Sequence, residues 1–260
     1  MKKSSALLKL WVFLFVAFIG WACDQKNGRE GVENTENASN TATDSGGENS
    51  LTAAEKEAGW QLLFDGTSME HFRGFRKDEV PEGWKVDDGA ITLAGKGAGD
   101  LITKEQYEDF ELSIDWKIAE GGNSGIFYHV SEDTAYANTY NSGPEMQVLD
   151  DERHPDAKRG VDGNRQAGSL YDLIPLSTPA VKPAGEWNTA RLVVKDGKVE
   201  HWLNDKKVVE YELGTPEWNS MIGKSKFATM KGFGAEKEGH IALQDHGDPV
   251  WFRNIKIRPL

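Results

Sequence analysis

The nine residues Phe110–Ile118 alternate strictly between apolar and polar side chains. Every even-numbered position of this run is apolar, and every odd-numbered position, from Glu111 to Lys117, is polar. Because successive side chains of a β-strand point to opposite faces of a sheet, the pattern predicts a strand with one face on a core. A chain organised around such strands has to fold as packed β-sheets.

Shorter alternating runs recur from Gly59 onward, separated by residues that tolerate turn conformations. Asp196-Gly197 and Asn204-Asp205 are two such hairpin signals. About ten to twelve short antiparallel strands in roughly 200 residues predict an all-β fold, a two-sheet sandwich or jelly roll. The other predicted strands are Trp60–Phe64, Trp84–Asp87, Ala90–Leu93, Gly125–Val130, Glu145–Leu149, Ala190–Val194, Val199–Leu203, Lys207–Glu212, His240–Gln244 and Val250–Ile257.

Helices are expected to contribute little to this fold. Ala53–Gly59 has room for only one or two turns, and no strand–helix alternation suggests a parallel α/β sheet. Two stretches, Ser131–Pro144 and Asp151–Ala167, are long, polar and irregular. Loops of this size in a compact β domain are typical of functional segments, so we expect a binding site beside them.

Charge and cysteine content exclude several kinds of partner and site. The 260 residues include 30 Lys and Arg against 42 Asp and Glu, a formal net charge of -12. Nucleic acid is therefore not an expected partner, since phosphate contacts need clustered basic side chains. The single cysteine, Cys23, excludes an intrachain disulfide framework and a cysteine-based zinc site.

Residues 1–22 predict an export signal. Three lysines precede the apolar run Leu10–Ile19, which as a helix would cross only about half of a bilayer core. The residues Gly20–Cys23 (GWAC) then resemble a bacterial lipobox, in which the cysteine thiol carries diacylglycerol. We therefore expect Cys23 to be lipidated and the exported protein to be anchored in the cell envelope, on its periplasmic or surface side.

Residues 23–58 predict a flexible linker behind this anchor. They are rich in Asn, Glu, Gly, Ser and Thr and have almost no large apolar side chain. Such a segment buries too little surface to offset the entropy lost on ordering. The sequence therefore divides into a signal peptide (1–22), a lipid-anchored linker (23–58) and one domain (59–260).

Seven sequence blocks follow one another in a specific order through residues 59–260. Together they resemble the 3-keto-disaccharide hydrolase family. The resemblance implies a concanavalin A-like lectin/glucanase jelly roll, a carbohydrate ligand, and cleavage of glycosides whose glucose C3 hydroxyl has been oxidised to a ketone. The blocks are Trp60–Thr67 (WQLLFDGT), Gly122–Tyr128 (GNSGIFY), Pro144–Asp150 (PEMQVLD), Gly168–Tyr171 (GSLY), Gly185–Thr189 (GEWNT), His201–Asn204 (HWLN) and Leu243–Ile255 (LQDHGDPVWFRNI).

Glu145 and Gln147 are the central catalytic hypothesis. Because alternate residues of a strand point to the same face, both side chains lie on one face of the predicted strand, and Asp150 lies at its end. Retaining glycosidases need two carboxylates flanking the scissile bond. One acid beside an amide therefore disfavours a retaining mechanism, unless another strand supplies the second carboxylate.

A 3-keto sugar requires a different set of groups. The ketone acidifies the proton on C2, so a base can remove it, after which a general acid assists departure of the oxygen on C1. Donors or a divalent metal ion can stabilise the enolate oxygen. We predict Glu145 as the base, with His129 and His246 as the candidate acid, donor or metal ligand.

Further polar side chains are predicted to contact the sugar. Several have an alternative structural role: Asp115 can lie on the solvated face, His129 can be a hydrogen-bonded core residue, and His201 lies near a predicted hairpin. Arg253 needs a carboxylate partner in either case, because an unpaired charge in an apolar strand is costly. The predicted substrate-binding residues are Asp115, Asn123, Gln147, Tyr171, His201, Gln244 and Arg253.

Two other functional classes are compatible with the sequence. A non-catalytic carbohydrate-binding module would use the same sheet face without a competent base. A hydrolase of unmodified glycans would need a second carboxylate roughly 5–10 Å from Glu145. No dinucleotide-binding glycine motif is present, so a separate oxidoreductase would have to supply a 3-keto substrate.

Overall fold

The computed structural model describes residues 46–95 and 97–260. The predicted signal peptide, Cys23 and residues 23–45 of the predicted linker lie outside these ranges. No helix in the described ranges is long and apolar enough to span a membrane. The strands are β1 (Gln61–Leu62), β2 (Phe72–Gly74), β3 (Trp84–Asp87), β4 (Ala90–Leu93), β5 (Leu101–Thr103), β6 (Phe110–Ile118), β7 (Asn123–Val130), β8 (Glu145–Leu149), β9 (Asn188–Lys195), β10 (Lys198–Leu203), β11 (Lys206–Glu212), β12 (His240–Leu243) and β13 (Val250–Pro259).

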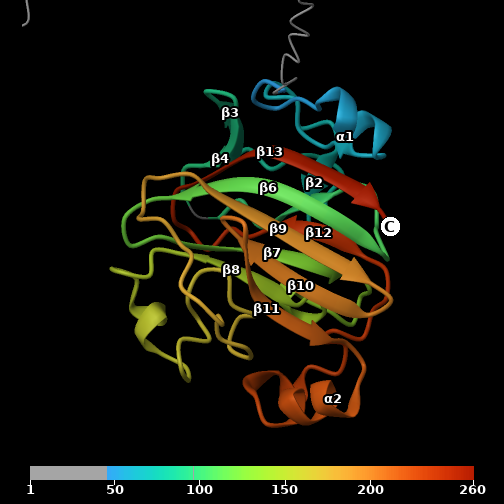
Figure 1. The fold of residues 1–260 in the computed structure, drawn as a ribbon, viewed down its shortest axis with the longest axis vertical. Coiled ribbons are helices and arrows are strands. Elements are labelled where there is room, and N and C mark those ends of the chain that lie inside the picture. Colours follow the sequence, from blue (N-terminus) through green and yellow to red (C-terminus); the bar gives the residue numbers. More distant parts are fainter. Residues whose placement is uncertain (1–45, 96) are drawn as a thin grey trace, which may run out of the picture. The chain divides into compact units, whose positions relative to one another are not determined.

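These strands form two antiparallel sheets that pack face to face (Figure 1). The eight-stranded sheet has the order β11-β10-β9-β6-β13-β4-β3, with β1 paired to β13. The five-stranded sheet has the order β2-β5-β12-β7-β8. The prediction of an all-β, two-sheet antiparallel sandwich is therefore confirmed. The helical segments are α1 (Ala53–Glu57), η1 (Thr139–Asn141), η2 (Pro155–Lys158), α2 (Pro216–Gly223) and η3 (Lys226–Thr229).

The predicted strands agree with the observed ones to within one or two residues at most ends. Phe110–Ile118 and Glu145–Leu149 match without change. The strands β2 and β5 were not predicted, because three residues are too few to display a period of two.

Alternation also decides which side chains of β7 and β8 reach the core. Ile126 and Tyr128 of β7, and Met146 and Val148 of β8, are buried against the apolar face of the other sheet. Each such side chain contributes about 1.5–3 kcal/mol on burial. The alternate residues of the same two strands therefore point to the outer face of the five-stranded sheet, and this face carries the site.

Residues 46–58 are not a flexible linker as predicted, because they fold against β13. The backbone N–H of Asn49 donates to Oδ1 of Asn254 at 2.6 Å, and the N–H of Asn254 donates to Oδ1 of Asn49 at 2.8 Å. Helix α1 begins with a capping box formed by Thr52 and Glu55, and Glu55 also pairs with Lys256. The segment is held by polar bonds rather than by apolar burial, so its composition suggested a linker.

A second unpredicted feature is the α2–η3 segment, residues 213–239 between β11 and β12. The hydroxyl of Thr215 accepts a hydrogen bond from the N–H of Trp218 and caps α2, which has Pro216 in its first turn. The Trp218 ring stacks on Tyr211 and Phe233, at centroid distances of 5.3 and 6.1 Å. The stacking on Tyr211 fixes the segment to the edge strand β11, beside which α2 lies in Figure 1.

Candidate functional site

A pocket of about 230 Å³ opens on the outer face of the five-stranded sheet. Strands β7 and β8 supply its floor, and the α2–η3 segment supplies one wall. The structure brings six predicted site residues together here: Asn123, Glu145, Gln147, Tyr171, Gln244 and His246. The other lining residues are Tyr140, Lys226, Phe227 and Met230.

Glu145 is the buried acid of this pocket. The residue is only 7% exposed, and its carboxyl oxygens hydrogen-bond to no residue in the described ranges. The pKa of Glu145 is raised to about 8, chiefly by burial, with the charge of Lys226 lowering it and the charges of Asp100 and Asp156 raising it. A carboxyl group with a pKa near neutrality and no protein partner is suited to proton transfer.

Two amide oxygens in the pocket also lack partners within the described chain. These are Oδ1 of Asn123 and Oε1 of Gln244, both buried. A buried acceptor without a hydrogen bond costs free energy, unless a ligand supplies the donor. Sugar hydroxyls are such donors, so the pocket floor fits a polyhydroxylated ligand.

Lys226 is the principal residue that the sequence analysis missed. About 40% of its side chain is exposed, and Nζ lies 4.0 Å from the Tyr171 ring centroid and 3.8 Å from Oδ2 of Asp172. Burial lowers the pKa of Lys226, partly offset by the charges of Asp172 and Glu145. Lys226 lies in an irregular segment about 80 residues after Glu145, and no alternating pattern of apolar and polar residues there could predict that it reaches the pocket.

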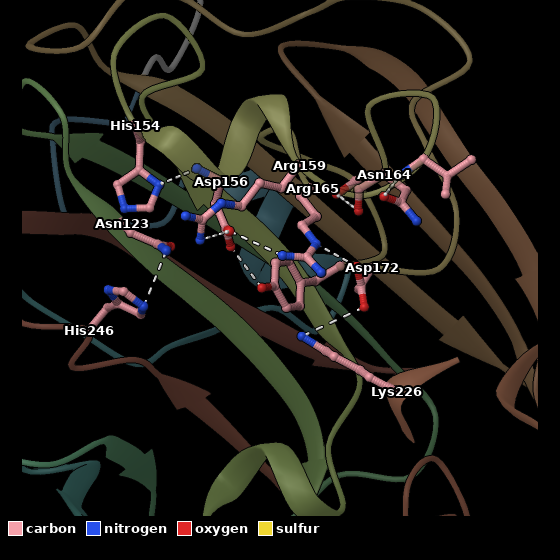
Figure 2. A network of polar contacts seen from close by, with 12 residues as sticks. Asn123, His154, Asp156, Arg159, Asn164, Arg165, Asp172, Lys226 and His246 are labelled. Carbon is pink, nitrogen blue, oxygen red and sulfur yellow. Dashed lines mark hydrogen bonds and ion pairs between the residues drawn. The ribbon is translucent and has the colours of Figure 1, made fainter. Parts of the chain in front are cut away.

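A polar network holds this wall of the pocket, as Figure 2 shows. The Tyr171 hydroxyl donates to Oδ2 of Asp156 at 2.8 Å, and Nη1 of Arg165 lies 3.1 Å from Oδ1 of Asp156. Nε of Arg165 then donates to Oδ1 of Asp172 at 2.5 Å. Burial and the bond to Asp156 raise the pKa of Tyr171, so this phenol stays neutral.

His246 lies at the opposite rim of the pocket. Its Nε2 is 3.3 Å from Nδ2 of Asn123, and its Nδ1 is 3.7 Å from Oδ2 of Asp248. The backbone N–H of Asn123 donates to the same Asp248 oxygen at 3.1 Å. The side chain of His246 is 46% exposed, so its imidazole is accessible from both the pocket and solvent.

One group of three potential metal ligands occurs within residues 46–95 and 97–260. His154, His246 and Asp248 each offer a ligand atom, all within 4.8 Å of one another. Nδ1 of His154, however, accepts the backbone N–H of Asp156 at 3.2 Å, which places the proton of the neutral ring on Nε2. His154 could bind a divalent cation through Nδ1 only by giving up that bond, and through Nε2 only after a change of tautomer.

The carboxylates whose charges act on Glu145 are those of Asp100 and Asp156. The carboxylate of Asp156 accepts hydrogen bonds from the side chains of Tyr171 and Arg165. Asp100 accepts from the Thr139 hydroxyl and, at 2.8 Å, from the backbone N–H of Asp245. Neither carboxylate lines the pocket, so the described residues offer no free second acid for a retaining pair.

The structure places two predicted histidines away from this pocket. His129 lines a separate cavity, where Nε2 lies 2.9 Å from the Glu108 carbonyl oxygen. His201 is fully buried in the core, with Nδ1 3.1 Å from the Gly168 carbonyl oxygen and Nε2 3.4 Å from the Tyr128 hydroxyl. Burial lowers the pKa of His201 to about 4. Neither histidine therefore reaches the pocket that holds Glu145, and the burial of His129 agrees with the core alternative that the sequence left open for it.

Asp115 and Arg253 also lie elsewhere, on the outer face of the eight-stranded sheet. Asp115 accepts hydrogen bonds from Thr189 Oγ1 at 2.6 Å and Asn254 Nδ2 at 2.7 Å. Arg253 pairs with Glu48 and packs over the Trp187 ring at 4.1 Å. Neither residue therefore lines the pocket that holds Glu145, because a period of two separates the two faces of a strand without showing which face holds the site.

The comparisons with known proteins place this fold and pocket in a family. The model of the 3-keto-alpha-glucoside-1,2-lyase-like domain matches residues 59–258. A protein of Bacteroides thetaiotaomicron named 3-keto-disaccharide hydrolase is 42% identical over 245 residues, covering 81% of this chain and 84% of that protein.

Solved structures of two Parabacteroides distasonis proteins classed as glycosyl hydrolases are also similar. The first is 36% identical with a TM-score of 0.77, covering 82% of this chain and 100% of that one. The second is 31% identical with a TM-score of 0.59, covering 77% of this chain and 99% of that one. The chain therefore belongs to the 3-keto-alpha-glucoside-1,2-lyase-like domain family.

Proposed function

We propose that the protein is a carbohydrate-active hydrolase that cleaves the glycosidic bond of 3-keto-glycosides. The observation that carries this proposal is the unpaired carboxyl group of Glu145, buried in a pocket with two unsatisfied amide oxygens. Family membership and the name of the Bacteroides relative support the same substrate class.

In the proposed reaction, Glu145 acts as the base and His246 acts as the acid. The carboxylate of Glu145 takes the C2 proton, and the electron pair moves through C3 onto the ketone oxygen. When the electron pair returns from the ketone oxygen, the bond from C1 to the glycosidic oxygen breaks, and His246 protonates the departing oxygen. Water then adds to C1 and C2 regains a proton, so the sum is hydrolysis.

The described residues favour this route over cleavage of an unmodified glycan. A retaining enzyme needs a second free carboxylate about 5–5.5 Å from the first, and an inverting one needs it about 6.5–9.5 Å away. Asp100 and Asp156 are the acids whose charges act on Glu145, and both are already hydrogen-bonded. Abstraction of a C2 proton needs only one base.

The test uses the full-length protein with an alkyl glucoside and its 3-keto derivative, with alcohol release followed by NMR. We expect release from the keto form alone, and its loss in Glu145→Gln with binding of the keto sugar retained. Glu152→Gln, a change at an exposed acid, is the matched control. Release from the plain glucoside would contradict the proposal, and binding without turnover would support the carbohydrate-binding module.

We also propose that the protein is exported and anchored by lipid on Cys23, which rests on the lipobox-like sequence Gly20–Cys23. Cells expressing the full chain with an alkyne fatty acid should yield labelled protein in the membrane fraction. The variant Cys23→Ala should lose the label. Equal labelling of both proteins would contradict the anchor.

A further inference from the structure

The elimination proposed above builds negative charge on the C3 oxygen, and Glu145 cannot stabilise it. Donors or cations placed where charge develops are a major source of catalytic power in such reactions. Among the side chains that line the pocket, Lys226 is the only lysine or arginine. Lys226 can act on a ligand only if its ammonium group has free hydrogen-bond donors.

Its surroundings leave the ammonium donors unused. Oδ1 of Asp172 accepts from Nε of Arg165, and Oδ2 of Asp172 lies 3.8 Å from Nζ of Lys226. That distance is an ion pair but too long for a hydrogen bond. Within the described chain Nζ makes no hydrogen bond, although the Tyr171 ring lies below it at 4.0 Å.

The side chain is nevertheless held in place. The ring of Tyr171 supports the ammonium by a cation–π contact, and the Tyr171 hydroxyl is fixed by Asp156. Figure 2 shows Lys226 and Asp172 at one end of this network, with His154 and His246 at the other side. Glu145 and Lys226 line the same pocket, the first as a carboxyl group and the second as an ammonium group, and neither makes a hydrogen bond within the described chain.

We propose that Lys226 binds the C3 carbonyl oxygen of the substrate and stabilises the enolate, which makes it the residue that selects oxidised sugars. This inference rests on the proposed function. C2 and C3 are bonded neighbours, so a base at C2 and a cation at the C3 oxygen must share one pocket. A C3 hydroxyl in the same place can accept a hydrogen bond from the ammonium, but it develops no negative charge and so gains no stabilisation of that kind in the transition state.

The electrons balance without a further reactant. The C2 proton moves to the Glu145 carboxylate, the C2–H pair becomes the C2–C3 double bond, and the carbonyl pair moves to the oxygen held by Lys226. Return of that pair expels the glycosidic oxygen from C1. The lysine stays protonated throughout and forms no covalent bond.

The experiment compares the full-length wild type with Lys226→Met, Lys226→Arg and the control Lys224→Met, which changes an exposed lysine at the end of α2. With an alkyl 3-keto-glucoside we expect kcat/KM to fall about 10²–10³-fold in Lys226→Met. Lys226→Arg should recover part of that loss, and Lys224→Met should match the wild type. A loss of less than about threefold in Lys226→Met would overturn the inference.

A binding measurement separates this inference from the proposed function. The wild type should bind 3-keto-glucose more tightly than glucose by isothermal titration, and Lys226→Met should lose that preference. If the preference depends on Lys226 but no glycoside is cleaved, the proposed function fails, whereas the part of the inference that assigns the C3 oxygen to Lys226 stands. A preference unchanged in Lys226→Met would overturn it, as would a Lys226–sugar adduct trapped by borohydride, which would indicate an imine.

Discussion

Gly125 lies directly beneath the carboxyl group of Glu145. A Cβ atom on Gly125 would come within 2.3 Å of Oε1 and 2.8 Å of Cδ of Glu145. Gly125 sits on β7 opposite Gln147 of β8 in the register, and its carbonyl oxygen accepts the backbone N–H of Gln244. The absence of a side chain therefore lets the acid lie flat over the neighbouring strand, in the centre of the pocket floor.

The substitution Gly125→Ala should displace this carboxyl group without unfolding the sheet. A misplacement of about 1 Å can cost about 10²-fold in rate, and overpacking costs about 1–3 kcal/mol of stability. We expect kcat/KM to fall by at least about tenfold, measured by alcohol release alongside urea unfolding. Gly223→Ala, where an added Cβ meets nothing within 4 Å, should leave kcat/KM unchanged. Equal activity in both variants would contradict the assigned position of the base.

The pH dependence of hydrogen exchange at C2 of a 3-keto-glucoside, which needs the base but not His246 as the acid, should report the ionisation of Glu145. Its pKa is raised to about 8, chiefly by burial, so the carboxylate needed for proton abstraction forms only as pH rises through that value. The rate should therefore increase from pH 6 to about 9. In Lys226→Met the rising limb should move to higher pH, because Lys226 lowers the pKa of Glu145. A rate that falls over this range would be inconsistent with a carboxylate base.

His201 should make the protein sensitive to acid. Its folded pKa of about 4 lies below the ordinary 6.5, so the unfolded chain binds the proton more readily. Stability from this group is complete above pH 6.5 and is lost as pH falls toward 4, by up to about 3 kcal/mol. Urea unfolding of His201→Gln should show a weaker loss over this window than the wild type does. His71→Gln, at an exposed histidine, should retain the wild-type slope.

The segment 46–58 should contribute measurably to stability. Asn49 is 8% exposed, and besides its two bonds with Asn254 it donates from Nδ2 to the Gly89 carbonyl oxygen at 2.8 Å. Asn49→Ala leaves buried partners unsatisfied, at about 1–3 kcal/mol. Urea unfolding should detect that loss, and should find little change for Ser50→Ala. Identical midpoints for Asn49→Ala and the wild type would mean that the segment is not docked in solution.

Sequence alone predicted most of the sheets, since long alternating runs such as Phe110–Ile118 carry a strong period. It also predicted that Glu145 and Gln147 share a face, because both lie on one strand. It could not say which face of a strand carries the site. Asp115 and Glu145 have similar local patterns, yet Asp115 lies on the outer face of the other sheet.

The missing part of the site comes from contacts between distant segments. Lys226 belongs to a short 3-10 helix and reaches the pocket through the stacking of Trp218 on Phe233 and Tyr211. No periodic pattern encodes such an approach. The prediction of a flexible linker for residues 46–58 failed for a related reason, because side-chain amides rather than apolar residues hold this segment in place.

Cleavage of a 3-keto-glucoside labelled with deuterium at C2 tests the account most directly. If Glu145 removes that atom, release of the alcohol should be slowed by about twofold or more, or deuterium should leave C2 faster than in an enzyme-free control. Glu145→Gln should abolish both effects. Alcohol release at an unchanged rate with deuterium fully retained at C2 would mean direct displacement at C1, and would contradict the elimination.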